Sequence, residues 1–270
     1  MENRKLGNLD VSAIGLGTLR TFDVESGPEI AVRQQIVDNC LTNDINFIDS
    51  AAWYGQAEKV VGITTEGKRD KFYLATKVRT EGKEAGEEQI ANSFHLFKTD
   101  YIDLSQVHNM VDYRTHIPTL TRLKEEGKIG MVGVSAMVHE AYPEIIELMK
   151  SRQVDTIQIP YNVVERGCED ELLPLAEELG IGVLVMEPLK KGRYVNELKS
   201  QPDLSPLADF GVKTWAQALL SWVLGDSRVS IAIPATSRPE RIQENALPGT
   251  LGQLPQELRD YVREETQRCL

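Results

Sequence analysis

Short apolar runs of strand length alternate along the chain with longer segments in which apolar residues recur at helical spacing. The short runs predict eight strands, at 13–18, 45–50, 72–78, 101–108, 131–136, 156–162, 182–189 and 230–236. Helical spacing is found in 28–41, 87–98, 115–128, 140–151, 169–180 and 214–225, and several of these segments end in Gly. Eight strands with intervening helices favour a closed parallel (β/α)8 barrel, the TIM barrel, over a doubly wound sheet, which usually has fewer strands.

The two ends of the chain add elements to this repeat. Residues 4–13 contain a Gly7-Asn8 turn signal and predict a β-hairpin that closes the barrel floor. Residues 261–270 predict a helix, so extra helices are expected near the C-terminus. The stretch 190–211 is the longest without clear periodicity, and long loops after barrel strands are usually functional. No repeat or linker divides the chain, which predicts a single domain over 1–270.

Charge and cysteine content exclude several classes of partner. The formal net charge is −11, so the long-range field repels nucleic acids and anionic membranes, and a small anionic ligand needs a local basic cluster. The three cysteines, Cys40, Cys168 and Cys269, have no CxxC or Cys/His spacing, which argues against disulfides and a metal site. No apolar signal segment or membrane span is visible, so a cytoplasmic protein is expected.

Four polar residues converge at one mouth of the predicted barrel. Asp49, Lys77 and His108 lie at or near the ends of the second, third and fourth strands, and Tyr54 follows the second. A tyrosine with an ordinary pKa near 10 exchanges protons poorly at neutral pH. A lysine ammonium ~4 Å away, in an effective dielectric of ~20, favours the phenolate by roughly 4 kcal/mol, or about three pKa units, which would bring the pKa of Tyr54 down toward neutrality. Tyr54 is therefore a candidate general acid, with Asp49 as counter-ion of Lys77 and His108 as hydrogen-bond donor to a carbonyl oxygen.

Each of these residues also has a structural interpretation. An aspartate at a strand end often caps a helix, a histidine after an apolar strand is often a core residue, and Tyr-Gly is common in turns. The functional interpretation depends on the coincidence of the four residues at successive barrel positions.

The motifs around these residues resemble the aldo-keto reductase family. "FIDSAAWYG" is similar to its Asp-x-Ala-x-x-Tyr-Gly signature, "LATKV" to its lysine strand and "YIDLSQVH" to its histidine strand. "GKIGMVGVSA", "IQIPYN" and "IPATSRPERIQEN" match further family segments in the same order, so the resemblance covers nearly the whole chain. It implies a reversible NADPH-dependent reduction of an aldehyde or ketone without a metal, in which Tyr54 is the proton donor.

The same resemblance implies a set of cofactor-binding residues. They are Gly17, Thr18, Ser135, Gln158, Met186, Pro188, Leu189, Lys191, Ile233, Thr236, Ser237, Arg238, Arg241, Glu244 and Asn245. Two positions differ from the family pattern, since Ala136 replaces an Asn or Asp and Met186 replaces a stacking aromatic. A guanidinium fork binds phosphate well, so Arg238 and Arg241 favour the 2′-phosphate of NADP. The alternative is an ordinary exposed helix with charge pairs.

The substrate site is expected at the mouth, with Leu19, Trp53 and Met110 among its walls, although Trp53 is equally compatible with core packing. The short loop after the fourth strand predicts an open, shallow site for varied or bulky small-molecule carbonyls. We expect a monomer or weak oligomer. The alternative function is a nucleotide-binding sensor or regulatory subunit of the same fold, with slow turnover.

Overall fold

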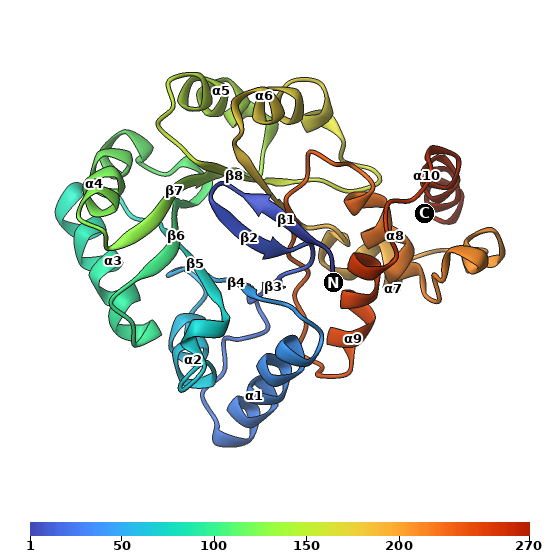
Figure 1. The fold of residues 1–270 in the computed structure, drawn as a ribbon, viewed down its shortest axis with the longest axis horizontal. Coiled ribbons are helices and arrows are strands. Elements are labelled where there is room, and N and C mark those ends of the chain that lie inside the picture. Colours follow the sequence, from blue (N-terminus) through green and yellow to red (C-terminus); the bar gives the residue numbers. More distant parts are fainter.

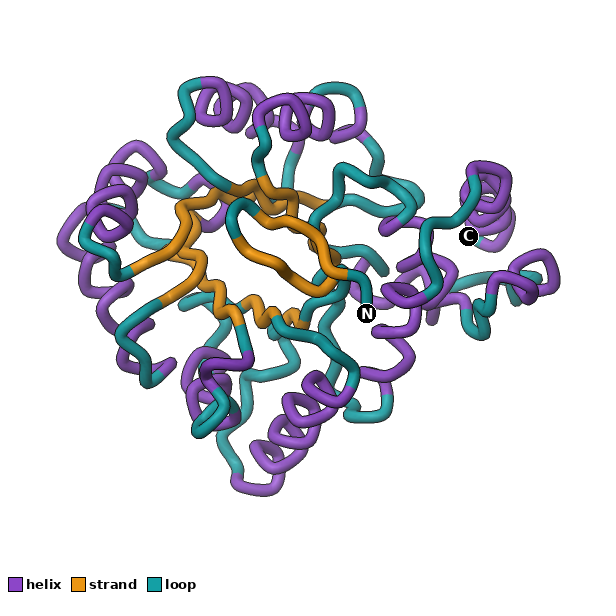
Figure 2. The backbone as a smooth tube through the Cα atoms, in the orientation of Figure 1, coloured by secondary structure: helices purple, strands orange, loops and turns teal.

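Eight parallel strands form a ring with helices outside it (Figure 1; Figure 2), in the computed structural model, which describes residues 1–270. Two parallel bridges, Ile14 with Ala232 and Gly17 with Ala235, join the first barrel strand to the last. The predicted closed (β/α)8 barrel is therefore confirmed. The strands are neighbours in chain order: β3 Leu16–Gly17, β4 Phe47–Asp49, β5 Tyr73–Val78, β6 Ile102–Val107, β7 Ile129–Ser135, β8 Thr156–Pro160, β9 Gly182–Met186 and β10 Ile231–Ala232.

Several strands are shorter than the sequence predicts, for local reasons. The run 230–236 yields only β10, because Pro234 has no N–H with which to continue a ladder. The run 182–189 ends at Met186, because Glu187 takes a left-handed backbone with φ 53°.

An N-terminal hairpin closes one end of the barrel, as predicted. Strands β1 Asn3–Leu6 and β2 Leu9–Ser12 pair antiparallel around Gly7, whose φ of 57° favours glycine. Leu6 and Val11 pack with Phe47, Leu104 and other buried residues in a small apolar cluster inside the barrel. Figure 1 shows the hairpin lying across the ring of strands. Since Phe47 begins β4, the hairpin covers the amino ends of the strands and leaves the carboxyl ends open.

Helices surround the barrel and carry recognisable start signals. Ser26 accepts a hydrogen bond from the Glu29 N–H at the start of the first helix, and Thr214 forms a capping box with Gln217 at the start of the eighth. The helices are α1 Gly27–Thr42, α2 Ala57–Thr64, α3 Lys83–Phe97, α4 Tyr113–Glu125, α5 Tyr142–Lys150, α6 Leu172–Leu179, α7 Arg193–Asn196, α8 Trp215–Leu224, α9 Arg241–Ala246 and α10 Gln256–Cys269. The C-terminal helices α8, α9 and α10 gather on one side of the barrel (Figure 1).

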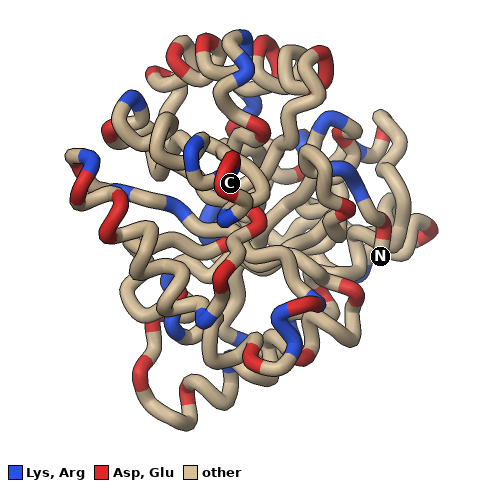
Figure 3. The backbone as a smooth tube through the Cα atoms, turned by 60° about the vertical axis from the view of Figure 1, so that its left-hand side comes forward, with Lys and Arg blue, Asp and Glu red and all other residues tan.

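The segment 190–211 is more ordered than its sequence suggests. It contains the short helix α7 and a 3-10 helix at Ser205–Phe210, so the absence of periodicity reflected short elements rather than one long loop. Outside the barrel, Figure 3 shows charged positions of both signs scattered over helices and loops. The excess of acid over base is therefore spread over the surface.

Candidate active site

A buried ion pair lies at the open end of the barrel. Asp49 ends β4, and Lys77 lies one residue before the end of the neighbouring strand β5. The Lys77 Nζ is 2.7 Å from each Asp49 carboxylate oxygen and 2.7 Å from the carbonyl oxygen of Ser50. The side chains are only 3% and 1% exposed, for Asp49 and Lys77 respectively. Asp49 is therefore a counter-ion and not a helix cap.

Tyr54 is held at this site by a tight turn. Its N–H bonds to the carbonyl of Ala51, and Gly55 follows with a φ of 59°. A Cβ at Gly55 would lie 2.2 Å from Oδ1 of Asp23, which accepts a hydrogen bond from the Gln56 N–H at 2.9 Å. The glycine after the tyrosine is thus required both by its backbone and by the close approach of Asp23.

The aromatic rings of Tyr54 and His108 meet beside the ion pair. Their centroids are 5.6 Å apart with an interplanar angle of 82°, an edge-to-face contact. The Lys77 Nζ lies 5.3 Å from the Tyr54 ring centroid. His108 directly follows β6, and its Nδ1 is buried without a hydrogen-bond partner. The four predicted residues therefore come together, and His108 is not a satisfied core residue.

Burial sets the direction of the pKa shift for Tyr54 and His108, whereas neighbouring charges set it for Lys77. It raises the pKa of the Tyr54 phenol above its ordinary value, and the opposing attraction of Lys77 is smaller. The expectation that Lys77 brings the pKa of Tyr54 down toward neutrality is therefore wrong, because it counted the cation and not the burial. Burial, with the charges of Lys77 and Arg79, lowers the pKa of His108 to about 3. Burial also acts to lower the pKa of Lys77, but Asp49 and Tyr54 outweigh it and leave that pKa raised.

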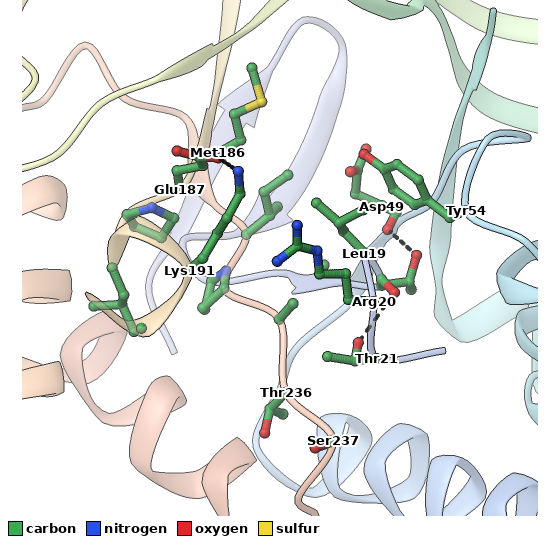
Figure 4. Close-up of a pocket in the computed structure, with 18 of the residues that line it drawn as sticks. Leu19, Arg20, Thr21, Asp49, Tyr54, Met186, Glu187, Lys191, Thr236 and Ser237 are labelled. Atoms are coloured by element: carbon green, nitrogen blue, oxygen red, sulfur yellow. Dashed lines mark hydrogen bonds and ion pairs between the residues drawn. The ribbon is translucent and has the colours of Figure 1, made fainter. Parts of the chain in front are cut away.

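A cavity of about 630 Å³ opens over these residues (Figure 4), a size within the usual range for ligand sites. Asp49, Tyr54 and His108 line it, together with Leu19 and Trp53 of the predicted substrate site. Trp53 is 62% exposed, which excludes its interpretation as a core residue. Most of the predicted cofactor residues also line this cavity: Gly17, Thr18, Gln158, Met186, Pro188, Leu189, Lys191, Ile233, Thr236, Ser237, Arg238, Arg241 and Asn245.

Besides the buried Lys77, three predicted residues lie outside the cavity wall. The Ser135 Oγ accepts a hydrogen bond from the Asn109 N–H at 3.0 Å and so supports the segment after His108. Glu244 accepts an ion pair from Arg241 at 2.6 Å. Met110, which has a left-handed φ of 58°, packs against the main core. Ser135 and Glu244 therefore contact residues that line the cavity, Asn109 and Arg241, whereas Met110 belongs to the core packing.

An amide network contacts the ion pair through Asp49. The Gln158 Nε2 donates to Asp49 at 3.4 Å, and the Gln106 Nε2 donates to the Gln158 Oε1 at 2.9 Å. Both glutamines are buried, at 1% and 0% exposure. Their amide N–H groups add donors to the Asp49 carboxylate and restrict its orientation.

The far part of the cavity is basic. Arg238 lies between β10 and α9, and Arg241 begins α9. The Thr236 Oγ1 accepts a hydrogen bond from the Arg238 N–H at 3.1 Å. Arg241 pairs with Glu244, as the charge-pair alternative expects, whereas Arg238 makes no ion pair within the protein. Lys191 pairs with Glu187 at 2.7 Å. The segment therefore combines the two alternatives, since it has a charge pair on a helix and also supplies basic residues to the cavity wall.

Several residues of the cavity wall were not predicted from the sequence. Arg20 and Thr21 immediately follow the predicted Leu19, and Figure 4 shows them among the lining residues. Arg79 lies two residues after Lys77 and just beyond the predicted strand, so its position in the sequence is the only signal that could have found it. The others are Asn109, Met137, Glu187, Gly192, Val195, Asn196, Ala216, Pro234 and Ala235. Three of these, Gly192, Val195 and Asn196, belong to the segment 190–211, which agrees with its expected functional role.

No group of three or more His, Cys, Asp or Glu side chains is placed to hold a metal ion. None of the helices has both the length and the apolar character needed to cross a membrane.

Comparison with known proteins gives the family that the sequence motifs resemble, along nearly the whole chain. The model of the Aldo/keto reductase family matches residues 13–264. Methylglyoxal reductase YeaE of Escherichia coli is 31% identical over 251 residues, which cover 89% of this chain and 86% of the relative. The NADH-specific methylglyoxal reductase of the same organism is 26% identical over 307 residues, which cover 91% and 92%.

The fold agrees with solved structures over its whole length. The crystal structure of an aldo-keto reductase from Klebsiella pneumoniae in complex with NADPH has a TM-score of 0.84 and 27% identity to this chain. The match covers 98% of this chain and 95% of the Klebsiella protein.

The buried ion pair generates a stability prediction. Lys77→Met leaves Asp49 buried without its partner, so we expect a loss of roughly 3–5 kcal/mol in the free energy of unfolding. The double variant Asp49→Asn/Lys77→Met removes both charges and should lose clearly less than the sum of the two single variants. Urea denaturation measures both.

Lys5→Met is the matched control, because Lys5 pairs with Asp10 at 2.8 Å but is 69% exposed. We expect little change from it. If Lys77→Met unfolds at the same urea concentration as Lys5→Met, Asp49 does not depend on Lys77.

Proposed function

Since the chain belongs to the aldo/keto reductase family, we propose that it is an NADPH-dependent oxidoreductase that reversibly reduces an aldehyde or ketone to an alcohol. The proposal rests on the position of Tyr54. Its side chain lines the cavity, and its ring centroid lies 5.3 Å from the Nζ of the buried Lys77. A phenol at a cavity wall next to a fixed cation is a suitable proton donor to a carbonyl oxygen.

His108 and Tyr54 divide the work at the carbonyl oxygen. Because the pKa of His108 is lowered to about 3, its imidazole is neutral at physiological pH and acts as a hydrogen-bond donor rather than an acid. The raised pKa of Tyr54 keeps the phenol protonated, which is the state that a proton donor needs. We therefore assign orientation of the carbonyl to His108 and proton transfer to Tyr54.

Lys77 favours the product state of that proton transfer. When Tyr54 gives up its proton, an ammonium ~5 Å away in an effective dielectric of ~20 stabilises the phenolate by about 3 kcal/mol. Asp49 keeps this ammonium charged in a site from which water is largely excluded. In the reverse direction the same phenolate accepts the proton of an alcohol. NADPH, when bound, supplies the hydride that reaches the carbonyl carbon.

The cavity suits a dinucleotide with a terminal phosphate. It runs from Tyr54 and His108 to Arg238 and Arg241, so its two ends differ in chemistry. Arg238 is exposed and carries no carboxylate partner, so its guanidinium is free to bind the 2′-phosphate of NADP. Lys191 supplies a further cation for the pyrophosphate if it leaves Glu187. The complex of the Klebsiella reductase with NADPH supports this cofactor, whereas the NADH-specific relative is the reason to test it.

The substrate side suits varied or bulky carbonyl compounds. Leu19 and Trp53 are 39% and 62% exposed at the cavity, so its mouth is open. The loop after β6 is short, since α4 begins at Tyr113, only five residues beyond His108. Methylglyoxal reductases among the relatives support an aldehyde as one substrate.

Removing the phenolic oxygen tests the assigned acid. Tyr54→Phe should lower kcat for aldehyde reduction roughly 10²- to 10⁴-fold, because proton transfer is lost, while the Kd for NADPH changes little. Steady-state NADPH oxidation with a panel of aldehydes and ketones measures the first, and a fluorescence titration measures the second. The control is Tyr113→Phe, which changes a tyrosine outside the cavity wall.

Full activity in Tyr54→Phe would refute the role of Tyr54. A wild-type protein that binds NADPH tightly but scarcely turns over any carbonyl of the panel would instead favour the nucleotide sensor.

Cofactor selectivity is tested at Arg238. Arg238→Gln should raise the Kd for NADPH roughly 10- to 100-fold and leave the Kd for NADH almost unchanged, because only NADPH carries the 2′-phosphate. The control Arg263→Gln, on α10 and outside the cavity wall, should alter neither affinity. Equal losses for both nucleotides would place Arg238 elsewhere on the cofactor, and no loss would remove it from the site.

A further inference from the structure

Arg79 lies at the open end of the barrel, two residues beyond Lys77 in the sequence. Lys77 is the last residue but one of β5, and Arg79 directly follows Val78, which ends this strand. Lys77 remains buried, whereas Arg79 is half-buried and lines the cavity beside Tyr54 and His108. Its charge reaches both rings, since it contributes to lowering the pKa of His108 and opposes the rise in the pKa of Tyr54.

The Arg79 guanidinium has no acidic partner. Only its backbone is bonded, the N–H to the Gln89 Oε1 at 2.5 Å and the carbonyl to the Gln89 Nε2 at 3.5 Å. Other arginines of this acidic chain, such as Arg166, Arg228 and Arg268, pair closely with carboxylates. A cation without a carboxylate at the reactive end of the cavity is therefore available to a ligand.

An aromatic ring holds this cation in place. The Arg79 Cζ lies 4.4 Å from the centroid of the Trp53 ring, which is itself part of the cavity wall. Stacking occupies one face of the guanidinium and leaves its N–H edges free. Those edges match the two oxygens of a carboxylate in a planar, bidentate arrangement. Trp53, which is 62% exposed, serves as a support for the cation rather than as part of the core.

We infer that Arg79 selects the substrate class, namely aldehydes or ketones that also carry a carboxylate, which Arg79 binds while the carbonyl lies at Tyr54 and His108. This inference rests on the proposed reduction. The net charge of −11 repels anions, so an anionic substrate needs a local cation at the site. Arg79 supplies that cation. Since Arg238 and Arg241 serve the phosphate end in the proposed binding mode, Arg79 remains free for the substrate.

Two substrates that differ only in charge test this inference. 4-Oxobutanoate and its methyl ester carry the same aldehyde, but only the first has a carboxylate. Arg79→Gln should lower kcat/KM for the acid roughly 10- to 100-fold more than kcat/KM for the ester, whose own change reports the effect of the Arg79 charge on Tyr54 and His108. The loss should appear mainly in KM, because the carboxylate contact is the same before and during the reaction. Arg79→Lys, which keeps the charge but not the fork, should lie between.

The matched control is Arg114→Gln, because Arg114 also stacks on an aromatic ring, 4.6 Å from the Tyr113 centroid, but lies outside the cavity wall. It should leave both substrates unaffected. A binding measurement separates this inference from the reductase function: succinate titrated calorimetrically into the NADP-loaded protein should bind the wild type at least about tenfold more tightly than Arg79→Gln.

The outcomes separate the two claims. Reduction of both substrates with no difference between wild type and Arg79→Gln would overturn the role of Arg79 and leave the reductase intact. Arg79-dependent succinate binding without any carbonyl reduction would support the anion site and refute the proposed reaction.

Discussion

The buried ion pair between Asp49 and Lys77 is the constraint on which the rest of the site depends. An ammonium in a dry cavity normally loses its proton or destabilises the fold by several kcal/mol. Here two carboxylate oxygens and the Ser50 carbonyl lie 2.7 Å from the Lys77 Nζ and hold the charge in place. Gln158 and Gln106 restrict the carboxylate in turn. A fixed positive charge beside Tyr54 follows from this arrangement.

The barrel makes the arrangement possible because apolar packing fills one of its ends and the polar site residues lie at the other. The hairpin and the small apolar cluster fill the amino end, where Leu6 and Val11 are fully buried. At the carboxyl end, Asp49 on β4 lies opposite Ala75 on β5, Lys77 follows two residues further along β5, and His108 comes directly after the next strand. Tyr54 is not on a strand, and its position is fixed instead by the turn at Gly55, against which Asp23 packs closely.

Much of this was visible in the sequence, and the exceptions have physical reasons. Strand alternation and strand ends are local properties, so the eight strands, the hairpin and the convergence of Asp49, Tyr54, Lys77 and His108 were predictable. The direction of the Tyr54 pKa was not, because burial depends on the packing of distant segments. Met110 and Ser135 depend on the left-handed turn after β6, which Asn109 tolerates but which Met110 does not indicate. Arg79 was overlooked because its free guanidinium is visible only when every carboxylate is placed.

The central claim is that the charge of Lys77 acts on the Tyr54 phenol, and the most direct test is the pKa of that phenol itself. With tyrosine labelled at ¹³Cζ and the Tyr54 signal assigned by its loss in Tyr54→Phe, an NMR pH titration compares the wild type with the double variant Asp49→Asn/Lys77→Met. The influence of Lys77 on this phenol exceeds that of Asp49, so removing both charges should raise the pKa of Tyr54 above its wild-type value. A pKa that is unchanged or lower in the variant would contradict the account.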